Sequence, residues 1–165
     1  MTPSTNVAAQ PNERTVVITR VFDAPRELVW KAWTDPKHMA QWWGPRGFTN
    51  PVCELDVRPG GTLRIVMRAP DGAEYPMKGV FREILQPERL VFTNIAVDTD
   101  GNQLLEGLTN VTLEEHGGKT KLTLRTHAVA LVAHAARMLE GMQAGWAQSL
   151  ERLGAHVARA GRQVA

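Results

Sequence analysis

The sequence predicts an α+β protein in which a curved antiparallel sheet packs against one long C-terminal helix. Three observations carry this prediction: segments with period-two alternation of apolar residues through the middle of the chain, two short helical segments after the first strand, and a long amphipathic segment at the end. The 165 residues suffice for one domain with a sizeable core. We expect a disordered tail over residues 1–12, a single domain over 13–160 and a C-terminal tail over 161–165.

Composition and charge exclude several classes of protein. The 19 basic and 17 acidic residues leave a net charge of +2 without any run of Lys or Arg, so we expect no nucleic-acid partner. No stretch approaches the roughly 18 consecutive apolar residues of a membrane span. The N-terminal residues lack the features of a signal peptide, and a single cysteine, Cys53, allows no disulfide framework. We therefore expect a cytoplasmic protein.

The first strand and the two short helices are read from local signals. The segment "RTVVITRVF" (Arg14–Phe22) is rich in β-branched residues, which favour strands. Pro25 suits the first turn of a helix, and Asp35 followed by Pro36 marks the start of a second helix. "GP" at 44–45 ends that helix, so the two helices form a bent hairpin.

Two adjacent tryptophans, Trp42 and Trp43, end the second short helix. Neighbouring positions point about 100° apart around a helix axis, so both cannot face one spot. We expect one to be core and the other to line the mouth of a cavity; the alternative is that both are core. The following "GPRGFTNP" is rich in turn residues and is a candidate entrance. It carries Phe48 and Arg46, which could meet an acidic ligand group or simply be solvated.

Six further strands are predicted after the entrance loop. Apolar residues alternate with polar ones in 53–57, 63–67, 73–85, 90–97, 106–115 and 120–126, and short turns separate these segments. Such spacing is typical of an antiparallel meander. Cys53 falls on the apolar side of its strand, which favours an inert buried thiol over a nucleophile.

The last segment predicts one long amphipathic helix. Its apolar residues keep a spacing of three or four: Leu131, Ala135, Met138, Met142, Trp146, Leu150, Leu153 and Val157. Glycine is unfavourable inside a helix, so Gly141 and Gly145 indicate close approach to the sheet or room for a ligand. The candidate ligand-binding residues are Trp42, Trp43, Arg46, Phe48, Met67, Met77, Phe81, Met138, Met142 and Trp146; core filling is the alternative role for the methionines and Phe81.

No residue pattern indicates a reaction, a metal site or a cofactor. The sequence contains no phosphate-binding glycine loop, no dinucleotide fingerprint and no nucleophile elbow. We assign no catalytic residue, no metal ligand and no cofactor. Any chemistry in a cavity would fall to polar residues of the sheet such as Glu54, Arg64, Arg82, Asn110 and Thr112, among which spacing does not select.

Three long segments carry a family resemblance. "FDAPRELVWKAWTDPKHMAQWWGPRGFTNPVCELDVRPGG", "MKGVFREILQPERLVFT" and "EGMQAGWAQSLERLGAHV" resemble, in order and spacing, the homologues of the heat-shock-protein-90 ATPase activator, a family of the START-like (SRPBCC) superfamily. The resemblance covers about Val16 to Val157. It implies a helix-grip fold enclosing an apolar cavity, and a bacterial source. Members of the superfamily bind lipids, polyketides, hormones or other apolar ligands, and a few catalyse cyclisations or hydrolyses.

We favour a binding protein for an apolar or amphipathic small molecule, lipid-like or polyketide-like. One alternative is a co-chaperone of the heat-shock-protein-90 chaperone; the eponymous activator has an additional N-terminal domain that we do not expect here, so a chaperone partner is disfavoured. The other alternative is a cavity enzyme of the cyclase or hydrolase type. A buried pair of titratable groups would support the enzyme, and a purely apolar lining would contradict it. An edge strand could also support a homodimer.

Overall fold

The computed structural model describes residues 12–164, so residues 1–11 of the predicted N-terminal tail and Ala165 lie outside the described residues. Its elements are β1 (Glu13–Phe22), α1 (Arg26–Thr34), α2 (Pro36–Trp42), β2 (Thr49–Leu55), β3 (Thr62–Arg68), β4 (Glu74–Leu85), β5 (Arg89–Val97), β6 (Gln103–His116), β7 (Lys119–Ala130), the 3-10 turn η2 (Ala133–Ala135), α3 (Ala136–Glu140) and α4 (Met142–Val164). No helix in this range is long and apolar enough to cross a membrane.

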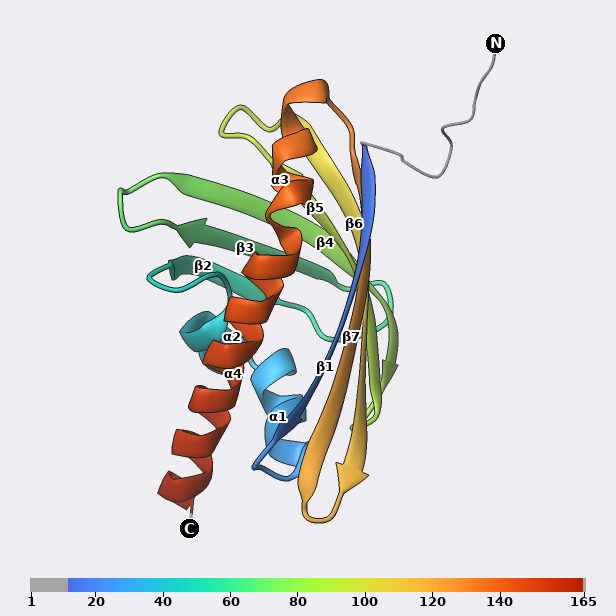
Figure 1. Cartoon of the computed structure of the whole chain (residues 1–165), viewed down its shortest axis with the longest axis vertical. Coiled ribbons are helices and arrows are strands. Elements are labelled where there is room, and N and C mark those ends of the chain that lie inside the picture. Colours follow the sequence, from blue (N-terminus) through green and yellow to red (C-terminus); the bar gives the residue numbers. More distant parts are fainter. Residues whose placement is uncertain (1–11, 165) are drawn as a thin grey trace.

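The strands form one antiparallel sheet that curves behind the helices (Figure 1). The order is β1-β7-β6-β5-β4-β3-β2, so β2 to β7 are a meander and β1 joins the far side of β7. In that last pair, Val16 lies opposite Thr126. The predicted α+β fold is confirmed: a seven-stranded antiparallel sheet, two short helices after the first strand, and a long C-terminal helix on one face.

The C-terminal helical segment is interrupted, unlike the single helix that the apolar spacing predicts. Leu131 lies outside any helix and is 42% exposed. Helix α3 ends at Glu140, Gly141 is its C-cap, and α4 begins at Met142. Glycine has a weak helix propensity, so the chain bends there at low cost. Helix α4 then runs as far as Val164, past the end of the apolar stripe.

Helix α4 packs on the sheet through a fully buried row. Leu150, Leu153 and Val157 each have 0% exposure. A Cβ at Gly154 would lie 3.1 Å from Cε1 of Phe22, at the end of β1, so glycine allows close approach of the helix there. Close approach to the sheet is not found at Gly141 or Gly145, for which we considered it: a Cβ would meet only the carbonyl of Met138, at 3.9 Å, at the first and nothing within 4 Å at the second.

An aromatic cluster joins the short helices to α4 and the sheet. Trp33 of α1 is 1% exposed, and its ring lies 4.7 Å from Trp42 and 6.3 Å from Trp43. On its other sides it lies 6.4 Å from the rings of Trp146 in α4 and Phe92 in β5. Aromatic pairs at these separations add to the free energy of burial. The cluster fixes the helical hairpin between the sheet and α4.

Two histidines meet where α2 packs on α4. Nδ1 of His38 lies 2.9 Å from Nε2 of His156, with the rings nearly perpendicular. Burial, the nearby His38 and Arg159 lower the pKa of His156 below its ordinary value. Because one ring nitrogen must donate and the other accept, this contact requires at least one neutral imidazole.

We expect acid to destabilise the protein through this pair. The unfolded chain takes up a proton near the ordinary histidine pKa of about 6.5, whereas folded His156 resists it until a lower pH. The contribution is therefore complete above about pH 7 and is lost as the pH falls below about 6.5. Urea unfolding at a series of pH values measures this slope. It should shrink in His156→Gln and persist in His116→Gln, an exposed control; equal slopes in both variants would contradict the assignment.

Candidate functional site

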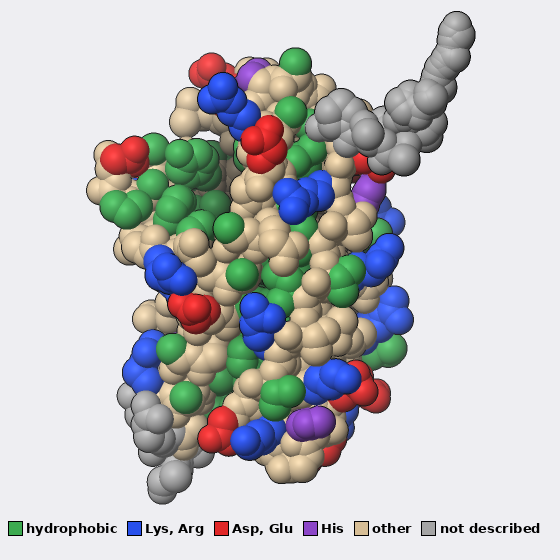
Figure 2. Space-filling model, viewed as in Figure 1, with side chains coloured by type: hydrophobic (Ala, Val, Ile, Leu, Met, Phe, Trp, Pro, Cys, Tyr) green, Lys and Arg blue, Asp and Glu red, His purple; other side chains and the backbone are tan. Residues whose placement is uncertain are grey.

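A cleft of about 220 Å³ opens between the first turns of α4 and the ends of strands β3 to β6. In Figure 2, apolar side chains gather over β3 and β4, and the surface is hollowed between them and the helix. Six of the ten predicted binding residues line this cleft: Trp43, Met67, Met77, Met138, Met142 and Trp146. They come from four separate parts of the chain, which the meander and the helix bring together.

The two adjacent tryptophans take different places, as helix geometry requires. Trp42 has 0% exposure, and its Nε1 donates a hydrogen bond to the carbonyl of Ala32 at 2.9 Å. Trp43 is 6% exposed and lines the cleft, 5.3 Å from the ring of Trp146 in a T-shaped arrangement. Trp42 therefore belongs to the core, and Trp43 forms a wall of the cleft.

The other three candidates lie outside the lining. Phe81 is 2% exposed and packs deeper in the core, 6.2 Å from the ring of Phe92. Phe48 packs beside the mouth, 6.0 Å from the ring of Tyr75. Arg46 is exposed and pairs with Glu151 on the outer side of α4, so it is not placed to meet a ligand group in the cleft.

The remaining lining residues are not among the ten candidates. They are Gly44, Pro45, Tyr75, Pro76, Asn94, Ala96, Leu105, Gly145 and Ser149. Gly145 was noted for its unfavourable position inside a helix, and a Cβ built there would meet nothing within 4 Å. The room for a ligand that we considered for this glycine is thus present. The alternation in β5 places Asn94 on the helix side of the sheet, but no pattern marks it as functional.

The lining offers little chemistry beyond apolar contact. The described part of the chain contributes no Asp, Glu, Lys, Arg, His or Cys to it, and the polar side chains are Tyr75, Asn94 and Ser149. The candidates for cavity chemistry lie elsewhere: Glu54 and Arg64, for example, form an exposed ion pair at 3.7 Å. Among residues 12–164, no group of three His, Cys, Asp or Glu side chains is placed to hold a metal ion.

Cys53 is poorly suited to act as a nucleophile. Burial, together with the nearby carboxylates of Asp35 and Glu54, raises the pKa of its thiol to about 11. Because the thiolate is the reactive form, the side chain is inert at neutral pH.

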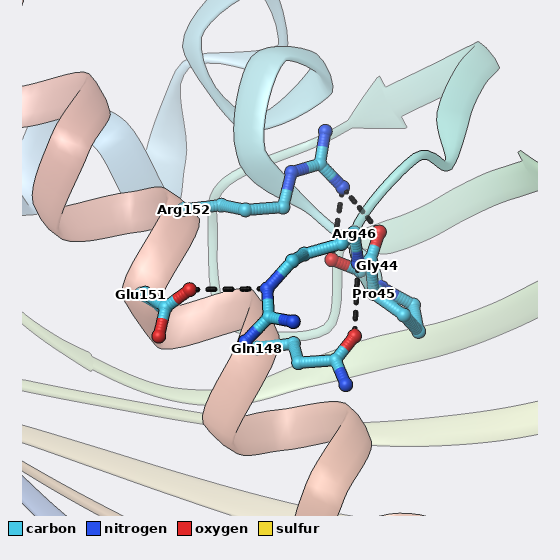
Figure 3. Close-up of polar contacts among 6 residues, drawn as sticks. All are labelled: Gly44, Pro45, Arg46, Gln148, Glu151 and Arg152. Carbon is cyan, nitrogen blue, oxygen red and sulfur yellow. Dashed lines mark hydrogen bonds and ion pairs between the residues drawn. The ribbon is translucent and has the colours of Figure 1, made fainter.

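A half-buried arginine of α4, Arg152, holds the loop that forms one lip of the cleft (Figure 3). Nη1 of Arg152 donates to the carbonyls of Trp43, Gly44 and Pro45 at 3.1, 2.9 and 2.9 Å. Its Nη2 donates to the carbonyls of Gln41 and Phe48 at 3.3 and 3.1 Å. Burial lowers its pKa, although an arginine stays charged at neutral pH. The cation thus donates to carbonyls in the last turn of α2 and in the loop after it, where the carbonyls of a helix end lack partners within the helix. The carbonyls of Trp43 and Pro45 also accept from Nδ2 of Asn50 and from the backbone N–H of Phe48.

Two further contacts attach the same loop to α4. The backbone N–H of Arg46 donates to Oε1 of Gln148 at 3.1 Å, and its Nε donates to Oε1 of Glu151 at 3.1 Å. Gly44 allows the turn, with a φ of +99° and only 3.0 Å between a Cβ built there and Sδ of Met67. The predicted entrance loop is therefore fastened to the helix.

Comparisons with known proteins agree on one family and one fold. The family described as Activator of Hsp90 ATPase homolog 1-like protein matches residues 23–158. A structure from Chromobacterium violaceum is 28% identical, with a TM-score of 0.73 and coverage of 89% of this chain and 98% of that chain. One from Rhizobium leguminosarum is 26% identical, with a TM-score of 0.74 and coverage of 89% and 95%. The AHSA1 protein from Silicibacter pomeroyi is 24% identical, with a TM-score of 0.73 and coverage of 88% and 98%. No curated protein matches the sequence.

Proposed function

The chain belongs to the family of Activator of Hsp90 ATPase homolog 1-like proteins, and from its cleft we propose that it binds an uncharged, apolar small molecule. The observation that carries this proposal is the lining. Trp43, Trp146 and four methionines line the cleft, and no charged side chain of the described residues does. Methionine adapts to the shape of a ligand, and aromatic walls offer large flat contacts.

The volume indicates a compact ligand. An apolar cavity of about 150 Å³ is known to accept benzene, whereas sites for drug-sized molecules span about 300–1,000 Å³. At about 220 Å³ and open at its mouth, the cleft suits a compact molecule of up to about three rings better than a long acyl chain. Tyr75 and Met138, which are 44% and 36% exposed, stand at the mouth, where a ligand would enter.

The same lining favours binding over catalysis and over recognition of an acid. A buried carboxylate would need a cationic partner, and Arg46 lies outside the lining and pairs with Glu151. Hydrolysis or cyclisation by acid–base chemistry calls for a titratable pair, and Tyr75 is the one ionisable side chain of the lining.

A chaperone interaction is the second candidate, because the family description names an activator of the Hsp90 ATPase. Stimulation of chaperone ATPase activity by the purified protein would support it. This interaction does not require the cleft, so a variant with a blocked cleft should stimulate the chaperone ATPase as strongly as the unaltered protein.

The proposal predicts that filling the cleft abolishes binding. Gly145→Leu places a side chain in the open space beside Trp146 and removes a helix-destabilising glycine. Binding is measured with N-phenylnaphthylamine, a neutral aromatic dye, through energy transfer from tryptophan. We expect saturable binding of one dye per chain, weakened at least about tenfold by Gly145→Leu, which is a loss of about 1.4 kcal/mol.

The control places the same side chain one residue earlier. Ala144 is exposed and outside the lining, so Ala144→Leu should bind the dye within about twofold of the unaltered protein. Native mass spectrometry of the fresh protein would show whether a molecule of a few hundred daltons co-purifies. Equal binding by the two variants, or no binding by the unaltered protein, would contradict the proposal.

A further inference from the structure

One polar side chain of the cleft is held in a single orientation. Asn94 lies in the middle of β5 and opposite Gly107 of β6. A Cβ at Gly107 would lie 2.9 Å from Nδ2 and 3.2 Å from Cγ of Asn94, so the amide occupies the space that a side chain would take. Because residue 107 has no side chain, the amide of Asn94 fits between the sheet and the cleft.

Two buried hydroxyls hold the oxygen end of this amide. Oγ1 of Thr109 donates to Oδ1 of Asn94 at 2.8 Å and lies 2.9 Å from Oγ1 of Thr126. Both threonines have 0% exposure. Thr109 and Thr126 lie opposite each other on β6 and β7, so the three side chains form a row across three strands.

The hydroxyl protons determine which way the amide faces. A hydroxyl has one proton, and Oδ1 can only accept, so Thr109 donates to Asn94 and accepts from Thr126. In the reversed amide, Nδ2 would donate to Thr109, and Thr109 would donate to Thr126. The Thr126 proton would then be buried without an acceptor, because within residues 12–164 its hydroxyl has no partner besides Thr109. The observed orientation satisfies every hydroxyl proton of the row.

This arrangement leaves the NH₂ group as a donor in the cleft. Nδ2 of Asn94 donates to no acceptor in the described part of the chain, and Asn94 is a lining residue. The hydroxyls of Tyr75 and Ser149 can rotate to donate or to accept, so each can pair with either a donor or an acceptor on a ligand. The amide nitrogen can only donate. A purely hydrocarbon ligand that covered it would leave a buried donor without a partner.

We propose that Asn94 selects an apolar ligand that carries a neutral hydrogen-bond acceptor, an oxygen of the ketone, ester or amide type. This inference rests on the proposed function, since it assigns the chemical class of the molecule bound in that cleft. The acceptor is neutral because no cation lines the cleft to balance an anion. The apolar walls supply contact area, and Asn94 sets the position of the carbonyl.

The test compares two probes of the same shape in two proteins. Acetylnaphthalene carries a carbonyl oxygen, and isopropenylnaphthalene has a CH₂ group in its place. In Asn94→Asp, Oδ1 still accepts from Thr109, and an acceptor oxygen replaces the NH₂ group. Because the ketone is also better solvated in water, the quantity to compare is the ratio of the two affinities in each protein.

We expect the ratio of ketone affinity to hydrocarbon affinity to fall about tenfold from the unaltered protein to Asn94→Asp at about pH 8. The carboxylate weakens binding of both probes, so the ratio of the two affinities carries the test. Asn110→Asp makes the same change on the opposite face of β6, outside the lining, and should keep the ratio. An unchanged ratio in Asn94→Asp would overturn the role of Asn94 while leaving the proposed function intact. Failure of both probes and of N-phenylnaphthylamine to bind the unaltered protein would overturn both.

Discussion

Trp42→Ala should lower the free energy of unfolding by about 3–5 kcal/mol, the range for removing a large aromatic side chain from a core. Trp42 has 0% exposure, its ring lies 4.7 Å from Trp33, and its indole N–H bonds to the carbonyl of Ala32. Its removal leaves a closed cavity and an unpaired carbonyl on α1. Urea unfolding followed by circular dichroism measures the loss.

Trp43→Ala, at the neighbouring position, should affect ligand binding more than stability. Trp43→Ala vacates space that is continuous with the cleft, where solvent can enter, so its cost in stability should be clearly smaller. Its effect on binding of N-phenylnaphthylamine should be the larger of the two. Trp42→Phe, which keeps a ring and loses the N–H, gives a measurable value if the alanine variant does not fold. Equal losses of stability at the two positions would contradict this division of roles.

Arg152→Met should cost about 2–4 kcal/mol, because it removes a charge-assisted hydrogen-bond donor shared by five carbonyls. Methionine keeps most of the apolar stem, so the loss reports mainly on the guanidinium. The carbonyls of Gly44 and Pro45 belong to the lip of the cleft, so dye binding should also weaken. Thermal and urea unfolding measure the first effect, and the dye titration measures the second.

Arg46→Met is the matched control for this substitution. It removes an ion pair between the same loop and the same helix, with both side chains about two-thirds exposed. Exposed pairs of this kind contribute less than about 1 kcal/mol. A loss in Arg46→Met as large as that in Arg152→Met would show that the loop is held by the exposed ion pair instead of by the half-buried Arg152.

The sequence was most informative where periodicity decides. Alternation of apolar residues predicted the strands and the meander, and helical geometry predicted that the side chains of Trp42 and Trp43 would point in different directions. The periods of a strand and of a helix are local properties of the backbone, so each segment shows them without reference to the rest of the chain. Periodicity assigned Phe81 to the correct face of its strand, but it carries no information on depth along the strand, so a core residue was grouped with lining residues.

Contacts between distant segments were not predictable from spacing. Arg152 meets carbonyls more than one hundred residues earlier in the chain, and the row of Asn94, Thr109 and Thr126 depends on the register of three strands. A slip of one residue in any of those pairings would turn a side chain to the other face. Arg46 was considered as a contact for an acidic ligand because its partner, Glu151, is equally remote in sequence.

The pairing of β1 with β7 has a consequence for how the protein is made. Within the sheet, Glu13–Phe22 pairs with Lys119–Ala130, which is synthesised after the five strands between them. Until then Val16 and Ile18, which are 1% and 4% exposed in the finished fold, have no sheet against which to pack. The sheet therefore cannot accept β1 before β7 has been made, and a nascent chain that lacks β7 presents the apolar side of β1 to chaperones and to other nascent chains.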